Sequence, residues 1–213
     1  MKIAIVDTGV GNTRSVANMM RRTRLDRPVE ILITDQASEL EMADGLVLPG
    51  VGAFDAGMRK LHQSGLDEIL SALVASGRPV MGLCLGMQLM LEGSEEGNAE
   101  GLGWIPGGCL RLPNLSPNGE KMRVPHMGWN VVEPPDDNVI YPQDGEEIRY
   151  YFDHSFALTN PAPGTAYGIT NYGVQFAAGV RMGHLFGFQF HPERSHRFGL
   201  ALFEQYLSYV EGQ

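Results

Sequence analysis

The first 91 residues alternate between short apolar runs and stretches with helical periodicity, and this alternation restricts the fold more than any other feature. The apolar runs have the length and composition of buried strands, and they lie at residues 3–7, 29–34, 45–48 and 80–83. Strands that alternate with helices in this way form a parallel sheet with helices packed on it. The first half of the chain is therefore predicted to be an α/β unit.

The stretches between the runs have the spacing of amphipathic helices. The first extends through Arg24 and places Val16, Met19 and Met20 toward the core. A second follows i, i+3, i+4, i+7 and i+8, with apolar residues at 66, 69, 70, 73 and 74. Residues 77–79, Gly-Arg-Pro, end that helix, and helical spacing resumes at residues 85–91.

The second half of the chain has a different residue pattern from the first half. Glycine, proline and asparagine punctuate residues 93–138, and extended segments are predicted at 149–158, 175–181 and 185–190. A last helix at about 196–210 would turn five apolar residues inward: Leu202, Phe203, Tyr206, Leu207 and Val210. No repeat or long linker divides the chain. We therefore expect a single domain over residues 1–213, with a mixed, mostly parallel central sheet flanked by helices.

Composition excludes several functions. The formal net charge is −9, which argues against a nucleic-acid binder, because such proteins neutralise phosphates with clustered Lys and Arg. No apolar run approaches the roughly 20 residues that span a bilayer, and residues 1–7 lack the apolar core of a signal peptide. We expect a cytoplasmic protein that binds neither nucleic acid nor membranes, with both cysteines reduced.

Residues 82–86, Gly-Leu-Cys-Leu-Gly, lie between the fourth predicted strand and the helix after it. At such a junction this pattern is typical of a sharp turn that lifts the central side chain out of the sheet, and the glycines avoid a clash. A helix N-terminus favours a thiolate, and the amide of Leu85 would point to a developing oxyanion. Cys84 is therefore a candidate nucleophile; the alternative is a buried structural cysteine.

A cysteine nucleophile needs a base and a group that orients the base. His191 follows the apolar run at 185–190, so it is expected at the carboxyl end of a strand, as is Cys84. Glu193 could hold the second ring nitrogen of His191. We expect a neutral His191 to act as the base, with activity falling at acid pH. The spacing alone would also fit a surface turn.

Two other kinds of site find less support. Gly9-Val10-Gly11-Asn12 after the first strand suggests a dinucleotide-binding turn, but Arg14 stands where that motif needs glycine. The histidines at 126, 154, 184 and 191 lack the spacing of zinc ligands. We therefore expect neither a metal nor a cofactor.

The motifs resemble those of the triad-type, class I glutamine amidotransferases: Gly-Leu-Cys-Leu-Gly-Met-Gln at 82–88 and Phe-His-Pro-Glu at 190–193. Three further segments are similar to the glutaminase subunits of imidazole glycerol phosphate synthase, and they lie at residues 49–54, 125–130 and 191–195. The resemblance runs from Ile3 to about Leu207. It implies a flavodoxin-like α/β fold and hydrolysis of L-glutamine to glutamate and ammonia.

The resemblance also implies roles for individual residues. Cys84 would attack the side-chain amide of glutamine, while His191 moves the proton and Glu193 orients His191. The backbone amides of Val51 and Leu85 would form the oxyanion hole. Other residues would hold the amino-acid end of glutamine: Gly52, Gln88 and Glu96, with main-chain groups around His154, Ser155 and Phe156.

A partner protein is implied as well, because ammonia released into bulk water would be protonated. In the resembling family this partner is a synthase (cyclase) subunit, a (β/α)8 barrel in a heterodimer, and the segments with Trp129 and Tyr151 face it. A core position is the alternative for both side chains. Glycines on both sides of Val51 would let its peptide rotate when the partner activates hydrolysis. Asp153 departs from the family pattern.

Some segments fit a related branch better. Residues 54–55 and 195–199 resemble a glutaminase that supplies ammonia to a sugar amidotransferase in surface-polysaccharide biosynthesis. The triad is the same in both branches, so the chemistry is shared and the acceptor is open. A non-enzymatic relative would lack Cys84 or His191. No role is assigned to Cys109.

Overall fold

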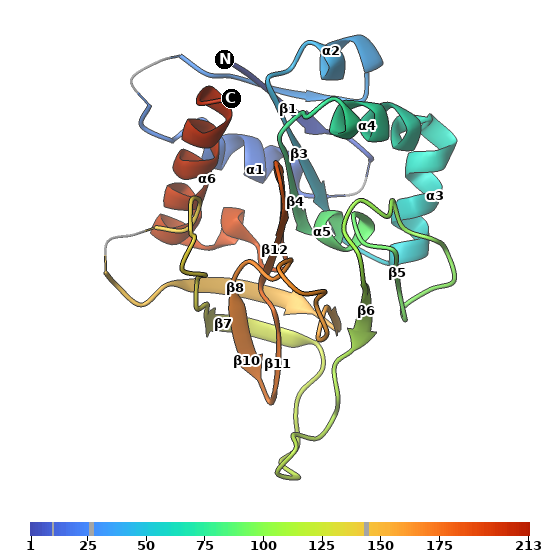
Figure 1. Ribbon diagram of the computed structural model, residues 1–213, viewed down its shortest axis with the longest axis vertical. Coiled ribbons are helices and arrows are strands. Elements are labelled where there is room, and N and C mark those ends of the chain that lie inside the picture. The colour runs from blue at the N-terminus through green and yellow to red at the C-terminus, as the bar shows by residue number, and fades with distance from the viewer. Residues whose placement is uncertain (10, 26–27, 143–144) are drawn as a thin grey trace.

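A six-stranded sheet forms the centre of the molecule, with helices on both faces and several small sheets below it (Figure 1). The computed structural model describes residues 1–9, 11–25, 28–142 and 145–213. Val10, in the glycine-rich turn after the first strand, lies outside the described residues.

The central sheet has the order β2–β1–β3–β4–β13–β12. Five strands are parallel: β2 (Glu30–Thr34), β1 (Lys2–Val6), β3 (Gly45–Gly50), β4 (Val80–Cys84) and β13 (Leu185–Phe188). The edge strand β12 (Gly179–Met182) is antiparallel to β13. The parallel strands have the order of a flavodoxin-like doubly wound sheet, and β12 extends it. The predicted α/β class with a mixed, mostly parallel sheet is therefore confirmed.

Helices cover both faces of this sheet, as Figure 1 shows. Two lie on one face: α1 (Thr13–Met20) and α6 (His196–Glu211). Four lie on the other: α2 (Ala37–Glu41), α3 (Phe54–Ser64), α4 (Leu66–Ala75) and α5 (Leu85–Leu89). Successive side chains of a strand point to opposite faces, so Ile3 and Ile5 pack with α1 and α6, while Ala4 and Val6 join the other core. None of the helices in the described ranges is long and apolar enough to cross a membrane.

The register places three strand ends side by side. Gly50, the last residue of β3, is paired with Cys84, the last residue of β4. On the other side of β4, Leu83 is paired with Phe188, the last residue of β13. Ligands bind at the carboxyl ends of strands in open α/β sheets, and the topology thus brings three chain segments to one such edge.

The second half of the chain builds small antiparallel and mixed sheets below the central one (Figure 1). A ribbon pairs β7 (His126–Val131) with β8 (Arg149–His154), and a hairpin pairs β10 (Ile169–Tyr172) with β11 (Val174–Ala177). The third group contains β5 (Gly93–Ser94), β6 (Gly108–Arg111) and β9 (Phe156–Ala157). The short 3-10 helix η1 (Pro192–Arg194) precedes α6.

Several predicted boundaries were wrong. The first helix ends at Met20 rather than Arg24, because the following N–H groups form tighter turns. The extended segment 149–158 changes partner at Ser155, from β7 to β6. The segment 175–181 likewise divides at Ala178 between β11 and β12. Three longer elements were not predicted at all: α2, α3 and β7.

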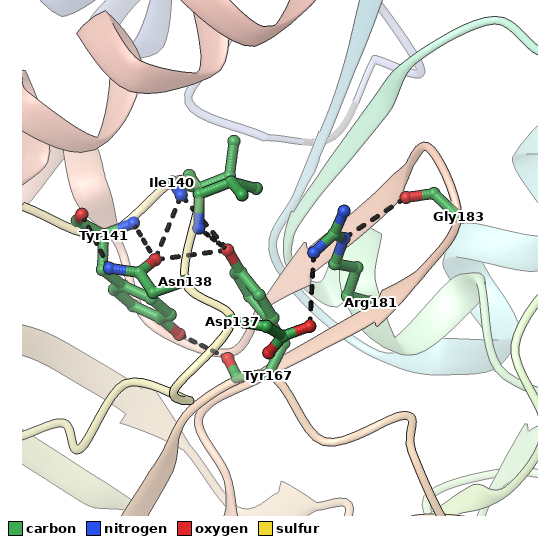
Figure 2. Close-up of polar contacts among 8 residues, drawn as sticks. Asp137, Asn138, Ile140, Tyr141, Tyr167, Arg181 and Gly183 are labelled. Atoms are coloured by element: carbon green, nitrogen blue, oxygen red, sulfur yellow. Dashed lines mark hydrogen bonds and ion pairs between the residues drawn. The ribbon is translucent and has the colours of Figure 1, made fainter.

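A network of partly buried hydrogen bonds holds the loop before Tyr141 against Tyr167 (Figure 2). The Tyr167 hydroxyl accepts the backbone N–H groups of Val139 (2.6 Å) and Ile140 (3.1 Å), and it donates to Asn138 Oδ1 (3.2 Å). The Tyr141 hydroxyl donates to the Tyr167 carbonyl at 2.7 Å. The two tyrosines thus satisfy backbone groups in a stretch without regular secondary structure.

Helix α5 packs unusually close to β3, and glycines make this possible. A Cβ at Gly86 would lie 1.8 Å from the carbonyl oxygen of Leu48. A Cβ at Gly50 would lie 2.9 Å from the Cβ of Leu85, and one at Gly82 would lie 2.4 Å from Met90 Sδ. The predicted need for small residues around the strand–helix turn therefore has a direct packing cause.

We predict that Gly86→Ala destabilises the protein by about 2–3 kcal/mol or prevents folding, because the new methyl group would overlap a backbone oxygen that cannot move alone. Urea unfolding followed by circular dichroism measures the change. Gly93→Ala is the matched control, since a Cβ there would meet no atom within 4 Å, and it should stay within about 0.5 kcal/mol of the wild type. Equal effects of the two substitutions would contradict the packing argument.

Candidate active site

Cys84 lies at the turn from β4 into α5 in a conformation that is rare for a residue with a side chain. Its φ is +52° and its ψ is −110°. Such a backbone is strained, and it persists where the surrounding structure imposes it. The side chain is only 7% exposed, yet it lines a cavity of about 600 Å³. The sharp turn that the glycine pattern predicted is therefore present.

His191 lies three residues beyond β13, and the neighbouring ribbon holds it in place. Its backbone N–H donates to the carbonyl of Tyr151 at 2.9 Å. The hydroxyl of Ser195 donates to the carbonyl of His191 (2.6 Å) and accepts the N–H of Tyr151 (3.0 Å). Ser195 is fully buried. This clamp fixes the backbone of His191 against β8.

Glu193 is positioned to orient the ring of His191. Its Oε1 is 3.0 Å from His191 Nδ1, and both side chains are buried. This contact leaves Nε2 of the ring for Cys84. Glu193 Oε2 is buried without a hydrogen-bond partner among the residues that the structure describes. The carboxylate therefore depends on a nearby positive charge for compensation.

The surroundings of His191 favour its charged form. Burial acts to lower its pKa, but hydrogen bonds to Cys84 and Glu193 and the charges of both groups outweigh burial and raise the pKa to about 10. At neutral pH the ring is an imidazolium beside the cysteine sulfur. The expectation of a neutral His191 took account of neither partner, and the fall of activity at acid pH stays a prediction.

The cavity above Cys84 contains every residue that the resemblance implied for the oxyanion hole and the substrate. These residues are Val51, Gly52, Leu85, Gln88, Glu96, His154, Ser155 and Phe156. The cavity also contains six residues that were not predicted as site residues: Asn12, Ser15, Ala53, Pro125, Asp153 and Arg194. Ala53, Pro125 and Arg194 lie in the motif segments at 49–54, 125–130 and 191–195. Asn12 ends the glycine-rich turn after the first strand, and Ser15 had no signal in the sequence.

Leu85 follows Cys84 in the chain, and Val51 follows the strand that is paired with the strand of Cys84. Val51 follows Gly50, the register partner of Cys84, and Leu85 is the first residue of α5. Gly52 has a φ of +102° and open space where a Cβ would be. The side chain of Val51 is 43% exposed. The side chain of Val51 is thus not packed into the core.

Glu96 is held against the start of α3. Its Oε2 accepts the backbone N–H of Phe54 at 2.8 Å. Nearby, Asp55 accepts the backbone N–H groups of Ala99 (3.0 Å) and Asn98 (3.0 Å), and these bonds hold the pKa of Asp55 below its usual value. The loop that carries Glu96 is therefore fastened to the helix, and the carboxylate keeps a fixed place at the cavity wall.

Two buried glutamines link the cavity wall to the cysteine. Gln88 Nε2 donates to the carbonyl of Phe156 (3.2 Å) and to Gln189 Oε1 (3.0 Å). Gln189 Nε2 lies 3.8 Å from Cys84 Sγ, within hydrogen-bonding range of sulfur. Sequence analysis missed Gln189, although it directly precedes the Phe-His-Pro-Glu segment.

Two buried histidines continue this network on the far side of the cavity. His154 Nδ1 is 2.9 Å from the Phe156 carbonyl, which can only accept, so Nδ1 carries the proton. His154 Nε2 therefore accepts from His126 Nδ1 (3.0 Å), and His126 Nε2 accepts from Asn130 (3.3 Å). Burial lowers the pKa of His126 to about 4 and that of His154 to about 3. Both rings are neutral, because each ring accepts a hydrogen bond through its unprotonated Nε2.

Trp129 and Tyr151 differ in exposure. Trp129 is 47% exposed and stacks on His196, with 5.6 Å between ring centroids. Tyr151 is half-buried, and the guanidinium of Arg194 lies 4.3 Å from its ring centroid. Arg194 also forms an ion pair with Asp153 at 3.6 Å. The core alternative is thus wrong for Trp129, and the unusual Asp153 has a local partner.

The second cysteine stands apart from this chemistry. Cys109 is buried in β6 and forms no disulfide with Cys84. Burial, and secondarily the charges of Cys84 and Glu96, raise the pKa of Cys109 well above its ordinary value. Within the described parts of the chain, no three His, Cys, Asp or Glu side chains are grouped as metal ligands.

Comparison with known proteins shows the family to which this chain belongs. Residues 4–207 match the model of the family described as glutamine amidotransferase class-I. The structure is similar to one described as a glutamine amidotransferase (TM-score 0.74, 16% identity, 98% of each chain). It is also similar to PurLQS from Thermotoga maritima (TM-score 0.72, 18% identity, 98% of each chain). The chain belongs to the class-I glutamine amidotransferase family.

Several relatives have a much higher sequence identity to this chain than the solved structures do. The chain is 43% identical over 209 residues to the imidazole glycerol phosphate synthase subunit HisH 2 of Pseudomonas aeruginosa, covering 98% of this chain and all of the relative. It is 44% identical over 202 residues to subunit HisH of Symbiobacterium thermophilum (94% and 91% covered). Subunit HisH of Bdellovibrio bacteriovorus is 40% identical over 205 residues (96% and 98%).

We predict that His191 keeps its proton as the pH rises past 7 and loses it only near pH 10, because Cys84 and Glu193 stabilise the imidazolium. Glu193→Gln removes one of these charges, so the midpoint should move to lower pH. NMR titration of the imidazole resonances measures both values. Glu147→Gln, at an exposed carboxylate paired with Arg149, is the control and should leave His191 unchanged. A wild-type midpoint below pH 7 would overturn the assignment.

We also predict that the free energy of unfolding decreases as the pH falls below about 6.5. The unfolded chain protonates its histidines near 6.5, whereas folded His126 and His154 resist protonation until about 4 and 3. The contribution of His126 and His154 to stability is therefore complete above 6.5 and is lost below it, by roughly 2–3 kcal/mol for each histidine at pH 4.5.

Urea unfolding between pH 4.5 and 6.5 measures this slope. His126→Asn retains a side-chain amide and cannot titrate, so its slope should be smaller by about one proton. This reading of the slope holds even if the variant is less stable overall. An unchanged slope would show that His126 is protonated equally in both states.

Proposed function

We propose that this chain is the glutaminase subunit of an imidazole glycerol phosphate synthase, which supplies ammonia for histidine biosynthesis in the cytoplasm. One observation carries the proposal: Cys84, His191 and Glu193 meet at the carboxyl edge of the sheet, inside a cavity that also holds the other implied residues. Near full-length similarity to HisH subunits of several bacteria supports the pathway.

The arrangement supports a two-step hydrolysis. The Cys84 sulfur bonds to the side-chain amide carbon of glutamine, and the amides of Val51 and Leu85 stabilise the oxyanion. The carbon–nitrogen bond then breaks, and His191 gives its proton to the departing ammonia. Water attacks the resulting thioester while His191 takes a proton from it. Glutamate leaves, and the thiolate–imidazolium pair is restored, with Glu193 orienting His191 throughout.

The cavity wall offers acceptors for the amino-acid end of glutamine. Both N–H groups of Gln88 are engaged by Phe156 and Gln189, so only its Oε1 remains to accept a bond from the substrate ammonium. Glu96 provides a carboxylate at the same wall. Gly52 and the main chain at residues 154–156 complete this side. Carbonyl and carboxylate oxygens suit an ammonium, which is a donor only.

A cyclase subunit with a (β/α)8 barrel is the partner we propose, in a heterodimer that passes ammonia directly between the sites. Met127 and Trp129 are both exposed, and they lie on the same side of the ribbon because they are two residues apart on β7. Tyr151 on β8 is the register partner of Trp129. Aromatic and methionine side chains are enriched in the cores of interfaces. This ribbon leads through His126 and His154 to the cavity wall, which links the docking side to the glutamine site.

Activation by the partner would act at Val51. Glycines flank this residue, Gly52 already has a left-handed φ, and the Val51 side chain is half-exposed. The peptide can therefore rotate at little steric cost and present its N–H to the oxyanion. Hydrolysis would then be slow in the free subunit and fast in the liganded complex, which protects glutamine from waste.

We predict that glutamate release from glutamine rises at least about tenfold when the cyclase subunit and its own substrate are added, since a coupling of this size is ordinary for an allosteric pair. A coupled glutamate dehydrogenase assay measures the rate. Cys84→Ala should abolish release in every mixture. Equal turnover in the free and the liganded states would contradict activation by a partner.

Two further arms test the acceptor and the docking side. A sugar amidotransferase replaces the cyclase in one arm, and activation by that partner instead would assign the chain to the polysaccharide branch. In the other arm, Trp129→Ala should weaken cyclase binding about tenfold or more, as expected of a central interface tryptophan. Met42→Ala, at an exposed methionine after α2, is its control and should bind as the wild type does.

A further inference from the structure

Gln189 makes a contact with the nucleophile that the triad does not account for. Its side-chain Nε2 lies 3.8 Å from Cys84 Sγ, and its Oε1 accepts from Gln88 Nε2 at 3.0 Å. The side chain is fully buried. A buried amide with both ends engaged is held in one place, so the contact with sulfur is built into the fold.

The direction of the Gln189 amide follows from its neighbours. The carbonyl of Phe156 can only accept, so the atom of Gln88 that faces it must be the nitrogen. The same nitrogen faces Gln189, which must therefore present its oxygen to Gln88. The nitrogen of Gln189 is left to face Cys84. The backbone carbonyl of Phe156 thus sets the direction of both amides, and an N–H group points at the sulfur.

We propose that Gln189 stabilises the Cys84 thiolate by donating an amide hydrogen bond to its sulfur, as a second support beside the His191 imidazolium. The inference rests on the proposed role of Cys84 as the nucleophile. Hydrogen bonds from neutral donors to an ionised acceptor are stronger than bonds between neutral groups. An N–H donor at a buried sulfur therefore favours the thiolate over the thiol.

Gln189 also connects the nucleophile to the substrate wall. Through Gln88 it is joined to the Phe156 carbonyl, which in addition accepts from His154. The other charged or titratable groups around Cys84 come from several elements: His191 and Glu193 after β13, His154 and Asp153 on β8, Glu96 after β5, Cys109 on β6 and Arg194 in η1. Gln189 is uncharged, so its contribution does not change over the pH range in which these groups titrate.

Alkylation of Cys84 by iodoacetamide tests the proposal in the free chain, with no partner or glutamine present. Only the thiolate reacts, and Cys109 is buried with a raised pKa, so the rate reports on Cys84. For Gln189→Met we expect a rate about tenfold lower than the wild type at pH 6, because the thiolate loses a donor. At pH 10 the loss should be smaller, because alkaline solution favours the thiolate in both proteins.

Gln189→Glu is a second variant, and it tests the proposal independently if the methionine variant does not fold. The glutamate has the same size and can still accept from Gln88, but it turns an oxygen toward the sulfur. Its rate at pH 6 should fall at least as far as that of Gln189→Met. Gln175→Met, at an exposed glutamine of β11, is the matched control and should react as the wild type does.

The outcomes separate this proposal from the proposed function. An unchanged alkylation rate at pH 6 would overturn the role of Gln189, because the substitution would then have no effect on the thiolate. An equal loss at pH 6 and pH 10 would also overturn it, because such a loss indicates that iodoacetamide reaches Cys84 less easily. Alkylation that persists in Cys84→Ala would instead overturn the assignment of the nucleophile. Failure of the cyclase to activate hydrolysis would contradict the proposed partner and pathway and would leave the role of Gln189 unaffected.

Discussion

The left-handed backbone at Cys84 is the constraint on which the rest of the site depends. A residue with a Cβ adopts this conformation only where its surroundings impose it, and here α5 is pressed against β3 through contacts that only glycine allows at positions 50 and 86. The turn lifts the sulfur to the carboxyl edge of the sheet. At that edge the parallel order brings β3 and β13 to either side, so the oxyanion segment and His191 approach Cys84 from opposite directions.

Charge balance then governs the chemistry. Glu193 is buried with one oxygen unpaired, and an imidazolium at His191 compensates it while facing the cysteine sulfur. Neutral groups lie on one side of this charged set: the amides of Gln88 and Gln189, with His154 beyond them. The uncharged donors orient the reacting groups without adding charges that would compete with the triad.

The sequence predicted the elements whose signals are local. Apolar runs and helical spacing located the strands of the parallel sheet, and paired glycines around Cys84 predicted the strained turn. Helix α3 was missed because its apolar residues, Phe54, Met58 and Leu61, begin inside a segment interpreted as a motif. The ribbon strand β7 was missed because its partner strand begins only at Arg149, beyond a long intervening segment, so no local pattern reveals the pairing.

Site residues divide in the same way. By itself the sequence determined the nucleophile, the histidine and the carboxylate as candidates, because each stands in a motif whose spacing follows from strand ends and turns. Only the tertiary structure decided that His191 is charged and that Gln189 faces the sulfur. Protonation and hydrogen-bond direction depend on which groups meet across the fold, and those groups are separated by about a hundred residues in the chain.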